Sequence, residues 1–199
     1  MTNKVVELNK NDEMFKEIAD EINNAKDDQL MIMARSYKNR KDDEVAPIAI
    51  KNGIYFYLTY DLGNNKYAYP SNQITVEQIY KAKTNMVRRA RLGSMMSIAF
   101  SDGDTLDDFM FTGDPMNVVT LDNKMYGSGL LYCEEFIRAI RNKIGDCYIL
   151  PSSIHELIFV PSNVVSKSDL CDMVHEVNKS AVSEIEYLAD RAFTIDEWL

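Results

Sequence analysis

Apolar residues along the chain follow a strand-like period of two in some segments and a helix-like period of about 3.6 in others. Residues 147–161 show the clearest strand pattern. Residues 148–150 are a short apolar run, and a first strand is expected to end at Pro151, which has no N–H to donate to a sheet. Residues 154–160 alternate, and both of their faces are mostly apolar beyond Glu156. This pattern predicts a second strand in the centre of a sheet, covered on both sides.

Further strands are predicted on both sides of an Asn-Gly turn. Residues 45–50 and 54–60 are rich in β-branched and aromatic side chains, and Asn52 and Gly53 between them are a strong hairpin signal. Residues 116–121 have the same strand-like composition and are followed by a turn. The sequence therefore predicts a hairpin in the first half of the chain and a separate strand at 116–121.

Helical spacing of apolar residues predicts four helices. Their apolar stripes run over residues 14–25, 79–90, 130–144 and 170–177, and the second helix is expected to end just before Gly93. Thr75 and Gln78 form a capping-box pattern before the second helix, and Ser168 is a candidate cap for the fourth. Because strands and helices alternate in the second half, we predict an α+β fold, with a mixed or antiparallel sheet and helices packed on it.

Length and composition limit the class of protein. We expect residues 1–199 to form a single α+β domain, with residues 1–40 as a candidate helical arm. The formal net charge of −9 argues against a general nucleic-acid coat protein. No apolar run approaches the roughly 20 residues that a membrane span needs, and no signal-peptide core is visible. The three cysteines are widely spaced and expected to be free thiols, so we predict a cytoplasmic protein with no membrane partner.

One local basic patch stands out in this acidic chain. It lies on the helix predicted after Thr75, with no acidic residue within it. Its members are Lys81, Lys83, Arg88, Arg89 and Arg91. Such a face can bind phosphate or an acidic partner. The alternative is a solvated face that is neutralised by the acidic segment 101–108.

The small loop Gly127, Ser128 and Gly129 precedes a predicted helix. A loop of this kind at a helix N-terminus can bind an anion. It matches neither a Walker motif nor a dinucleotide-binding motif, because the spacing and the following residues differ. The alternative is that the small residues satisfy the geometry of the loop.

Ser153, His155 and Glu156 are the residue types of a hydrolase, and they follow Ser152 in the predicted turn. Ser153 and His155 are two residues apart and would share one face of a strand, whereas Glu156 would point to the other face. No G-x-S-x-G motif is present. The alternative is a structural role, in which these side chains hold the turn and contact flanking helices.

Four residues are candidate zinc ligands. Cys171 and His175 are four apart on a predicted helix, and Cys147 and His155 lie on neighbouring predicted strands. The spacing matches no standard zinc module, and lone cysteines are usually buried as small hydrophobic residues. We therefore predict no metal and no cofactor.

Several short motifs in residues 118–196 are similar to one known family. They are TLDNK at 120–124, YGSG at 126–129, YILPSSIHE at 148–156, MV at 173–174 and EVN at 176–178. On these motifs, the C-terminal part of the chain resembles an uncharacterised domain-of-unknown-function family, number 5688, found in anaerobic gut bacteria. The family has no established activity, so the resemblance implies a compact intracellular domain and supplies no mechanism.

Taken together, these patterns favour a binding or interaction protein without catalytic activity. The expected partner is another protein, and nucleic acid is not favoured because of the net charge. Two alternatives stay open. One is a small hydrolase-like enzyme or small-molecule binder that uses the turn at residues 152–156, and the other is a phage or mobile-element protein that antagonises a host system.

Overall fold

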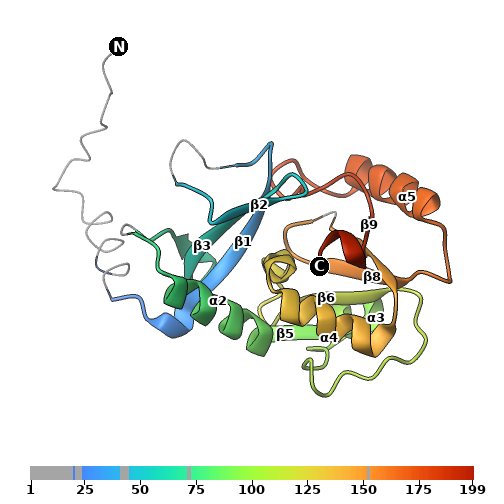
Figure 1. The fold of residues 1–199 in the computed structure, drawn as a ribbon, viewed down its shortest axis with the longest axis horizontal. Helices are drawn as coiled ribbons and strands as arrows, with labels where there is room; N and C mark the ends of the chain where they lie inside the picture. The colour runs from blue at the N-terminus through green and yellow to red at the C-terminus, as the bar shows by residue number, and fades with distance from the viewer. Residues whose placement is uncertain (1–19, 21–23, 41–44, 71–72, 152) are drawn as a thin grey trace, which may run out of the picture.

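Two antiparallel sheets form the framework of the computed structural model, which describes residues 20, 24–40, 45–70, 73–151 and 153–199 (Figure 1). The first sheet consists of β1 (Leu30–Ser36), β2 (Ala49–Lys51), β3 (Ile54–Gly63) and β4 (Lys66–Ala68). β1 pairs along one side of β3, and β2 and β4 pair along the other side. The hairpin prediction is confirmed, because Asn52 and Gly53 adopt positive φ angles of 53° and 78° and join β2 to β3.

The second sheet has the strand order β5-β6-β8-β7-β9. These strands are β5 (Ala90–Ser94), β6 (Asn117–Leu121), β8 (Leu157–Pro161), β7 (Cys147–Leu150) and β9 (Phe193–Thr194). β8 lies in the centre, as its alternating sequence predicts, and each face of it is covered. Leu157 and Phe159 enter the main core, whereas Val160 and its neighbours enter a smaller core on the other face.

The helices pack on and between these sheets, which confirms the α+β prediction. The α-helices are α2 (Val76–Arg89), α3 (Met95–Phe100), α4 (Glu134–Ile144) and α5 (Lys167–Ser180). The 3₁₀ helices are η1 (Asp27–Gln29), η2 (Gly127–Tyr132) and η3 (Ile195–Glu197). In the described part of the chain, no helix is both long and apolar enough to cross a membrane.

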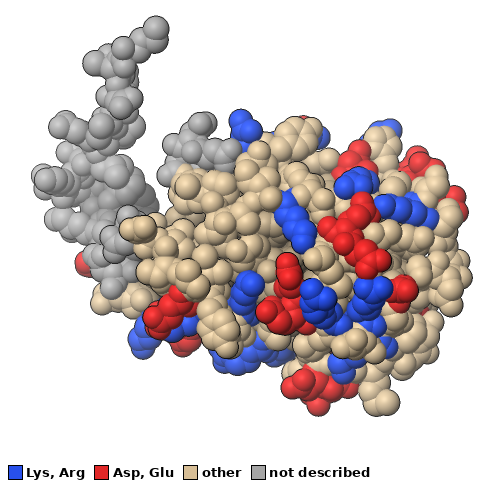
Figure 2. Space-filling view, viewed as in Figure 1, with Lys and Arg blue, Asp and Glu red and all other residues tan. Residues whose placement is uncertain are grey.

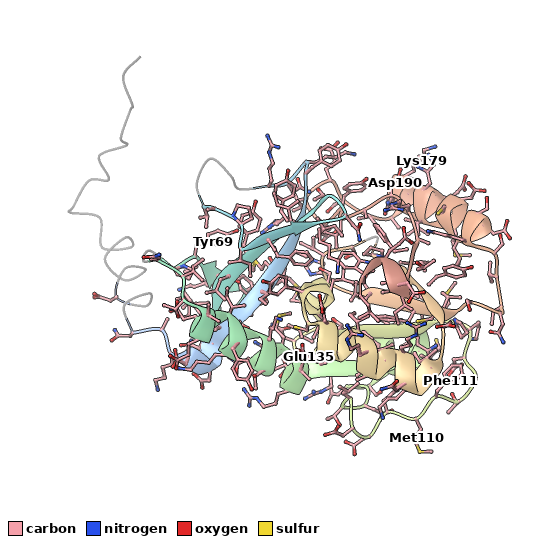
Figure 3. The ribbon with its side chains drawn as sticks, in the orientation of Figure 1. Tyr69, Met110, Phe111, Glu135, Lys179 and Asp190 are labelled. Carbon is pink, nitrogen blue, oxygen red and sulfur yellow. The ribbon has the colours of Figure 1, made fainter. Side chains whose placement is uncertain are left out.

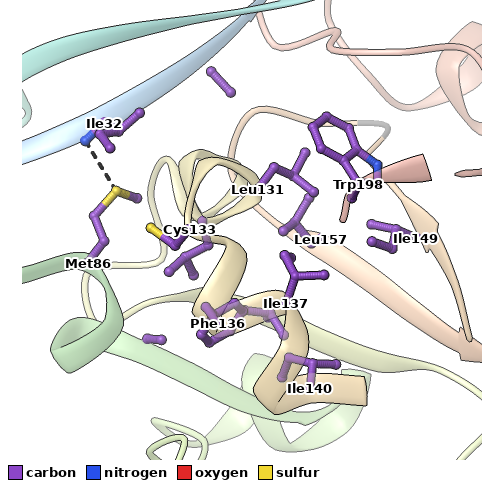
Figure 4. Close-up of a cluster of buried hydrophobic side chains, with 14 of the residues drawn as sticks. Ile32, Met86, Leu131, Cys133, Phe136, Ile137, Ile140, Ile149, Leu157 and Trp198 are labelled. Atoms are coloured by element: carbon purple, nitrogen blue, oxygen red, sulfur yellow. Dashed lines mark hydrogen bonds between the residues drawn. The ribbon is translucent and has the colours of Figure 1, made fainter. Parts of the chain in front are cut away.

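The main core is shared by the two sheets and by α2, η2 and α4. Figure 4 shows Phe136 and Ile137 of α4 between Met86 of α2 and Trp198 near the C-terminus. Each buried side chain of this size contributes about 1.5–3 kcal/mol by leaving water. The backbone N–H of Ile32 donates to the thioether sulfur of Met86 at 3.1 Å, so α2 covers the free edge of β1.

Several boundaries differ from the sequence predictions. Residues 30–36 form the buried strand β1 and are not part of a helical arm; most of the rest of the predicted arm lies outside the described residues. The second helix ends at Arg89 rather than near residue 92, because residues 90–94 pair with β6 as β5. Its capping box at Thr75 is confirmed.

Two further boundaries differ from the predictions, because a side chain or a loop bonds to backbone groups near the predicted ends. The fourth predicted helix is capped by Ser166, whose hydroxyl accepts the N–H of Asp169, and Ser168 lies inside it. The central strand begins at Leu157 rather than Ile154. Residues 153–155 instead bond to η2 and to the C-terminal segment, as the next section describes.

Candidate functional site

The basic residues of the predicted patch lie on α2 and on the strand that follows it. α2 buries Ala82 and Met86 against β1 and leaves the opposite side open. In Figure 2, Lys and Arg side chains gather along the lower edge of the molecule, over the C-terminal half of α2. The five predicted residues nevertheless have three different environments.

Two of the five cations are already neutralised. Lys81 lies 2.6 Å from the carboxylate of Asp27 and 2.7 Å from that of Glu77, and these hydrogen bonds raise the pKa of Lys81. Arg89 contacts Asp61 and Asp122, at 2.9 Å each, and only 16% of its side chain is exposed. Neither residue therefore offers a free charge to a partner. The acidic groups come from η1, α2, β3 and the turn after β6, not from the segment 101–108.

Arg91 has a different environment, because it does not lie on the helix. Arg91 is in β5, and its guanidinium donates to the backbone carbonyls of Arg88 and Ala90 at 3.4 and 2.9 Å. This position corrects the prediction that Arg91 extends the basic face of the helix. The chain turns into β5 after Arg89, and Arg91 shares the face of the sheet on which α3 packs.

Lys83 and Arg88 line a groove of about 750 Å³. One wall is a stripe of α2, and the other consists of residues 105–107 and the start of α4. Figure 3 shows Glu135 between α2 and α4, on this second wall. Within the described residues, neither Lys83 nor Arg88 has an ion-pair partner, although Lys83 lies 4.9 Å from the centre of the Tyr132 ring. We call this hollow the α2 groove.

The α2 groove has an apolar floor and charged walls. Val87, Leu106 and Cys133 supply apolar surface, and Asp107 and Glu135 face the two cations from the opposite wall. Burial raises the pKa of the Cys133 thiol to about 12, so this sulfur is a neutral packing group and not a nucleophile. The groove therefore offers an apolar surface with charges of both signs on its walls.

The loop Gly127, Ser128 and Gly129 is buried in η2, and its backbone N–H groups are occupied. They donate to the carbonyls of His155, Ile154 and Tyr126, respectively. The Ser128 hydroxyl also donates to the carbonyl of Ile154, at 2.6 Å. No N–H of this loop is left for an anion, so the arrangement favours the alternative that small residues satisfy the loop geometry.

The two glycines of this loop permit close backbone approaches. A Cβ atom on Gly129 would lie 1.8 Å from the carbonyl oxygen of Ile32, and one on Gly127 would lie 2.6 Å from the Cα of Thr120. Atoms cannot approach this closely, so no other residue fits without a shift of β1 or β6. The loop joins the two sheets by backbone contact.

Ser153 and His155 are close in the chain, but their side chains have separate partners. The Ser153 hydroxyl accepts the backbone N–H of His155 at 3.0 Å. The ring of His155 accepts the N–H of Tyr126 at Nδ1 (3.4 Å) and lies 3.4 Å from Glu186 at Nε2. Both ring nitrogens are thus engaged away from Ser153, which favours the structural alternative for these residues. Ser152 lies outside the described residues.

Glu156 points to the opposite face of the sheet from His155, where it lines a groove beside α3. Burial raises the pKa of Glu156, and His155 and a hydrogen bond with Ser153 oppose this effect. Sequence reasoning missed Glu186, which binds His155 from a segment about thirty residues further along the chain. No local signal in the sequence links these two residues.

The four candidate zinc ligands are not brought together. Cys147 is in the main core, whereas Cys171 packs against the smaller core on the other face of the sheet. His155 pairs with Glu186, and His175 pairs with Asp190 at 2.7 Å. Among the residues that the structure describes, no group of three or more His, Cys, Asp or Glu side chains is placed to hold a metal ion.

Fold and groove together define an α+β protein with two antiparallel sheets and an open groove along one helix. The chain belongs to the family of unknown function DUF5688, whose family model matches residues 1–196. The match covers nearly the whole chain, so a resemblance confined to residues 118–196 was too narrow a prediction. No curated protein and no solved structure matches the chain.

Proposed function

We propose that this protein acts by binding another protein, and that the α2 groove holds a segment of the partner that carries acidic side chains. The observation that supports this proposal is the division among the basic residues. Lys81 and Arg89 are paired within the protein, whereas Lys83 and Arg88 line the groove with no ion-pair partner among the described residues. Cations on the wall of an apolar groove gain more from an incoming carboxylate than fully exposed ones do.

The charges on the opposite wall determine how a partner segment can be oriented in the α2 groove. Asp107 and Glu135 would repel a uniformly acidic segment, so the partner must place its acidic side chains against α2 and neutral or basic ones against α4. Tyr80, at 69% exposure, offers an aromatic contact at one end of the stripe. A peptide with one acidic edge and one apolar edge meets these requirements.

The net charge supports a protein partner over nucleic acid. A molecule with a formal net charge of −9 repels a phosphate backbone at a distance, and two free cations are few for a nucleic-acid surface. We also place the protein in the cytoplasm, because its three cysteines are free and two of them are buried as thiols. Both statements are part of the proposal.

The experiment is an affinity capture from lysate of the source cells, with bound protein and bound nucleic acid both measured. The baits are the wild type, Lys83→Glu, Arg88→Glu and the control Lys179→Glu. Lys179 is an exposed lysine in the last turn of α5, so the control makes the same change in charge on another face.

The proposal predicts a stoichiometric protein on the wild type and on the control, reduced about tenfold or more on each groove variant. Equal capture by all four baits would place the partner elsewhere on the surface. Recovery of nucleic acid, or capture of nothing by the wild type, would contradict a protein-binding role for this groove.

A further inference from the structure

A second, smaller groove lies on the other face of the second sheet. α5 covers β7 and β8 on this face, and α3 crosses β5. Between α3 and the sheet is a hollow of about 190 Å³, which we call the α3 groove. Its lining consists of Met95, Ile98, Ala99, Val118, Thr120, Glu156 and Ile158.

Ser94 and Gly93 position α3 on the sheet. The hydroxyl of Ser94 accepts the N–H of Ser97 at 3.1 Å and caps the helix. Gly93 lies directly beneath α3: a Cβ atom on Gly93 would come within 2.8 Å of the Ser97 hydroxyl. The helix is therefore positioned by contact with β5, and its exposed side chains are held at a defined place beside the groove.

α3 directs large apolar side chains into water. Met95, Met96 and Phe100 are 54%, 67% and 81% exposed. Three large exposed apolar residues on one short helix are typical of an interaction surface. Methionine is also flexible and polarizable, which suits it to partners of irregular shape.

Glu156 supplies the one charged group in the lining of the α3 groove. Within the described residues, no Lys or Arg lies within ion-pair distance of its carboxylate. The charge of His155 lowers the pKa of Glu156, but the two ring nitrogens of His155 are engaged by Tyr126 and Glu186. Arg91 shares the face with Glu156, but its guanidinium is bonded to the carbonyls of Arg88 and Ala90. The groove therefore contains a partly buried carboxylate that is hydrogen-bonded to Ser153 and has no Lys or Arg partner among the described residues.

We propose that the α3 groove binds an apolar segment of a partner protein that carries one lysine or arginine. The apolar side chains of the segment would cover Met95, Met96 and Phe100, and its cation would pair with Glu156. Charge complementarity selects this occupant over an anionic lipid surface, which both the carboxylate and the net charge of −9 would repel. The inference does not depend on the α2 groove, which lies on α2 and has the opposite free charge.

The test uses two labelled model peptides of about twelve residues, the length of an average helix. Both are amphipathic sequences of leucine, alanine and glutamine. One has a central lysine and the other has a central glutamate. Binding is followed by fluorescence anisotropy against the full-length wild type, Glu156→Gln, Phe100→Ser and the control Glu176→Gln, which removes an exposed carboxylate from α5.

The wild type and the control are expected to bind the lysine peptide about tenfold more tightly than the glutamate peptide, which corresponds to about 1.4 kcal/mol. Glu156→Gln should remove this preference, and Phe100→Ser should weaken both peptides about equally. Phe100 is exposed, so its replacement should leave the melting temperature unchanged, which separates lost binding from lost folding.

Three results would overturn the inference. The first is a lysine preference that survives in Glu156→Gln. The second is full binding by Phe100→Ser. The third is a wild type that elutes as a dimer while Phe100→Ser elutes as a monomer, because the patch would then bind a second copy of the chain. Lys83→Glu should bind the lysine peptide as the wild type does, which keeps this result distinct from the test of the α2 groove.

Discussion

The loop at residues 126–129 and the α2 groove use their polar groups in opposite ways. The loop is small and largely buried, and each of its backbone N–H groups donates to residue 126, 154 or 155. The groove is open, and Lys83 and Arg88 have no ion-pair partner there within the described residues. The motifs that resemble active-site chemistry thus form hydrogen bonds within the fold, whereas the two unpaired cations lie on a helix with no recognisable motif.

The YGSG motif contacts Ile154 and His155, which belong to a second motif that resembles the family. Gly127 and Ser128 donate to the carbonyls of His155 and Ile154, and Tyr126 donates to the His155 ring. Thr120 donates to the same carbonyl of His155 at 2.9 Å. A single interlocked unit therefore joins β6, η2 and the start of β8, which holds the main core against the first sheet.

The largest expected effect on stability comes from a substitution at Gly129, in η2 of that unit. Gly129→Ala should destabilise the protein by about 3 kcal/mol or prevent folding, because a Cβ atom would lie 1.8 Å from the Ile32 carbonyl oxygen. Gly113→Ala is the matched control. Gly113 has φ +88° with nothing within 4 Å, so only backbone strain of about 1 kcal/mol is expected. Urea unfolding of the two variants measures the difference, and equal costs would contradict the close approach.

The next effect separates two adjacent arginines. Arg89→Ala should cost about 2 kcal/mol, because it leaves the carboxylate of Asp61, only 12% exposed, without its cation. Arg88→Ala should change stability by less than about 0.5 kcal/mol, since Arg88 has no ion-pair partner in the described chain. Thermal unfolding of both variants tests whether Arg89 is paired and Arg88 is not. A large loss of stability in Arg88→Ala would show that this arginine is structural, which would weaken the proposal for the α2 groove.

A smaller effect distinguishes the two carboxylates on either side of His155. A hydrogen bond from Ser183 and the neighbouring His155 lower the pKa of Glu186, whereas burial raises that of Glu156. A lowered pKa means that Glu186 stabilises the fold above its unfolded pKa and that this stability is lost as the pH falls. The sign of the effect on stability is reversed for Glu156. Its raised pKa means that ionised Glu156 destabilises the folded protein at neutral pH.

At neutral pH, Glu186→Gln should therefore lower the melting temperature, and Glu156→Gln should raise it slightly. The difference for Glu156→Gln should shrink as the pH falls to about 4, whereas the difference for Glu186→Gln should be lost only below that pH, because the pKa of Glu186 is lowered. Melting curves between neutral and acidic pH measure this. Differences that keep the same size over this range would exclude titration of these two groups as their cause.

Local patterns predicted much of the fold. The Asn52-Gly53 hairpin, the Thr75 capping box and the central strand β8 each depend on residues close in sequence, and each was found. The helix α3 was missed because six residues are too few to show a helical period. β5 was missed because its residues continue the apolar spacing of α2 until Gly93 ends it.

The site was less accessible to sequence reasoning. Glu77, four residues before Lys81, is the one local sign that Lys81 is paired, and only the fold places Asp27 against Lys81. Only the fold likewise places Asp61 and Asp122 against Arg89. The role of Gly129 also depends on a strand that lies about a hundred residues earlier in the chain. Contacts between distant segments leave no periodic trace, so these assignments required the structure.

The most direct test of the central claim is the amount of partner protein captured by Lys83→Glu relative to Lys179→Glu from the same lysate. Both variants make the same change of charge at a lysine on a helix, although Lys83 is half-buried beside Tyr132 and Lys179 is exposed. The account predicts that the partner is retained by Lys179→Glu and reduced about tenfold or more on Lys83→Glu. Equal capture by the two variants would contradict it.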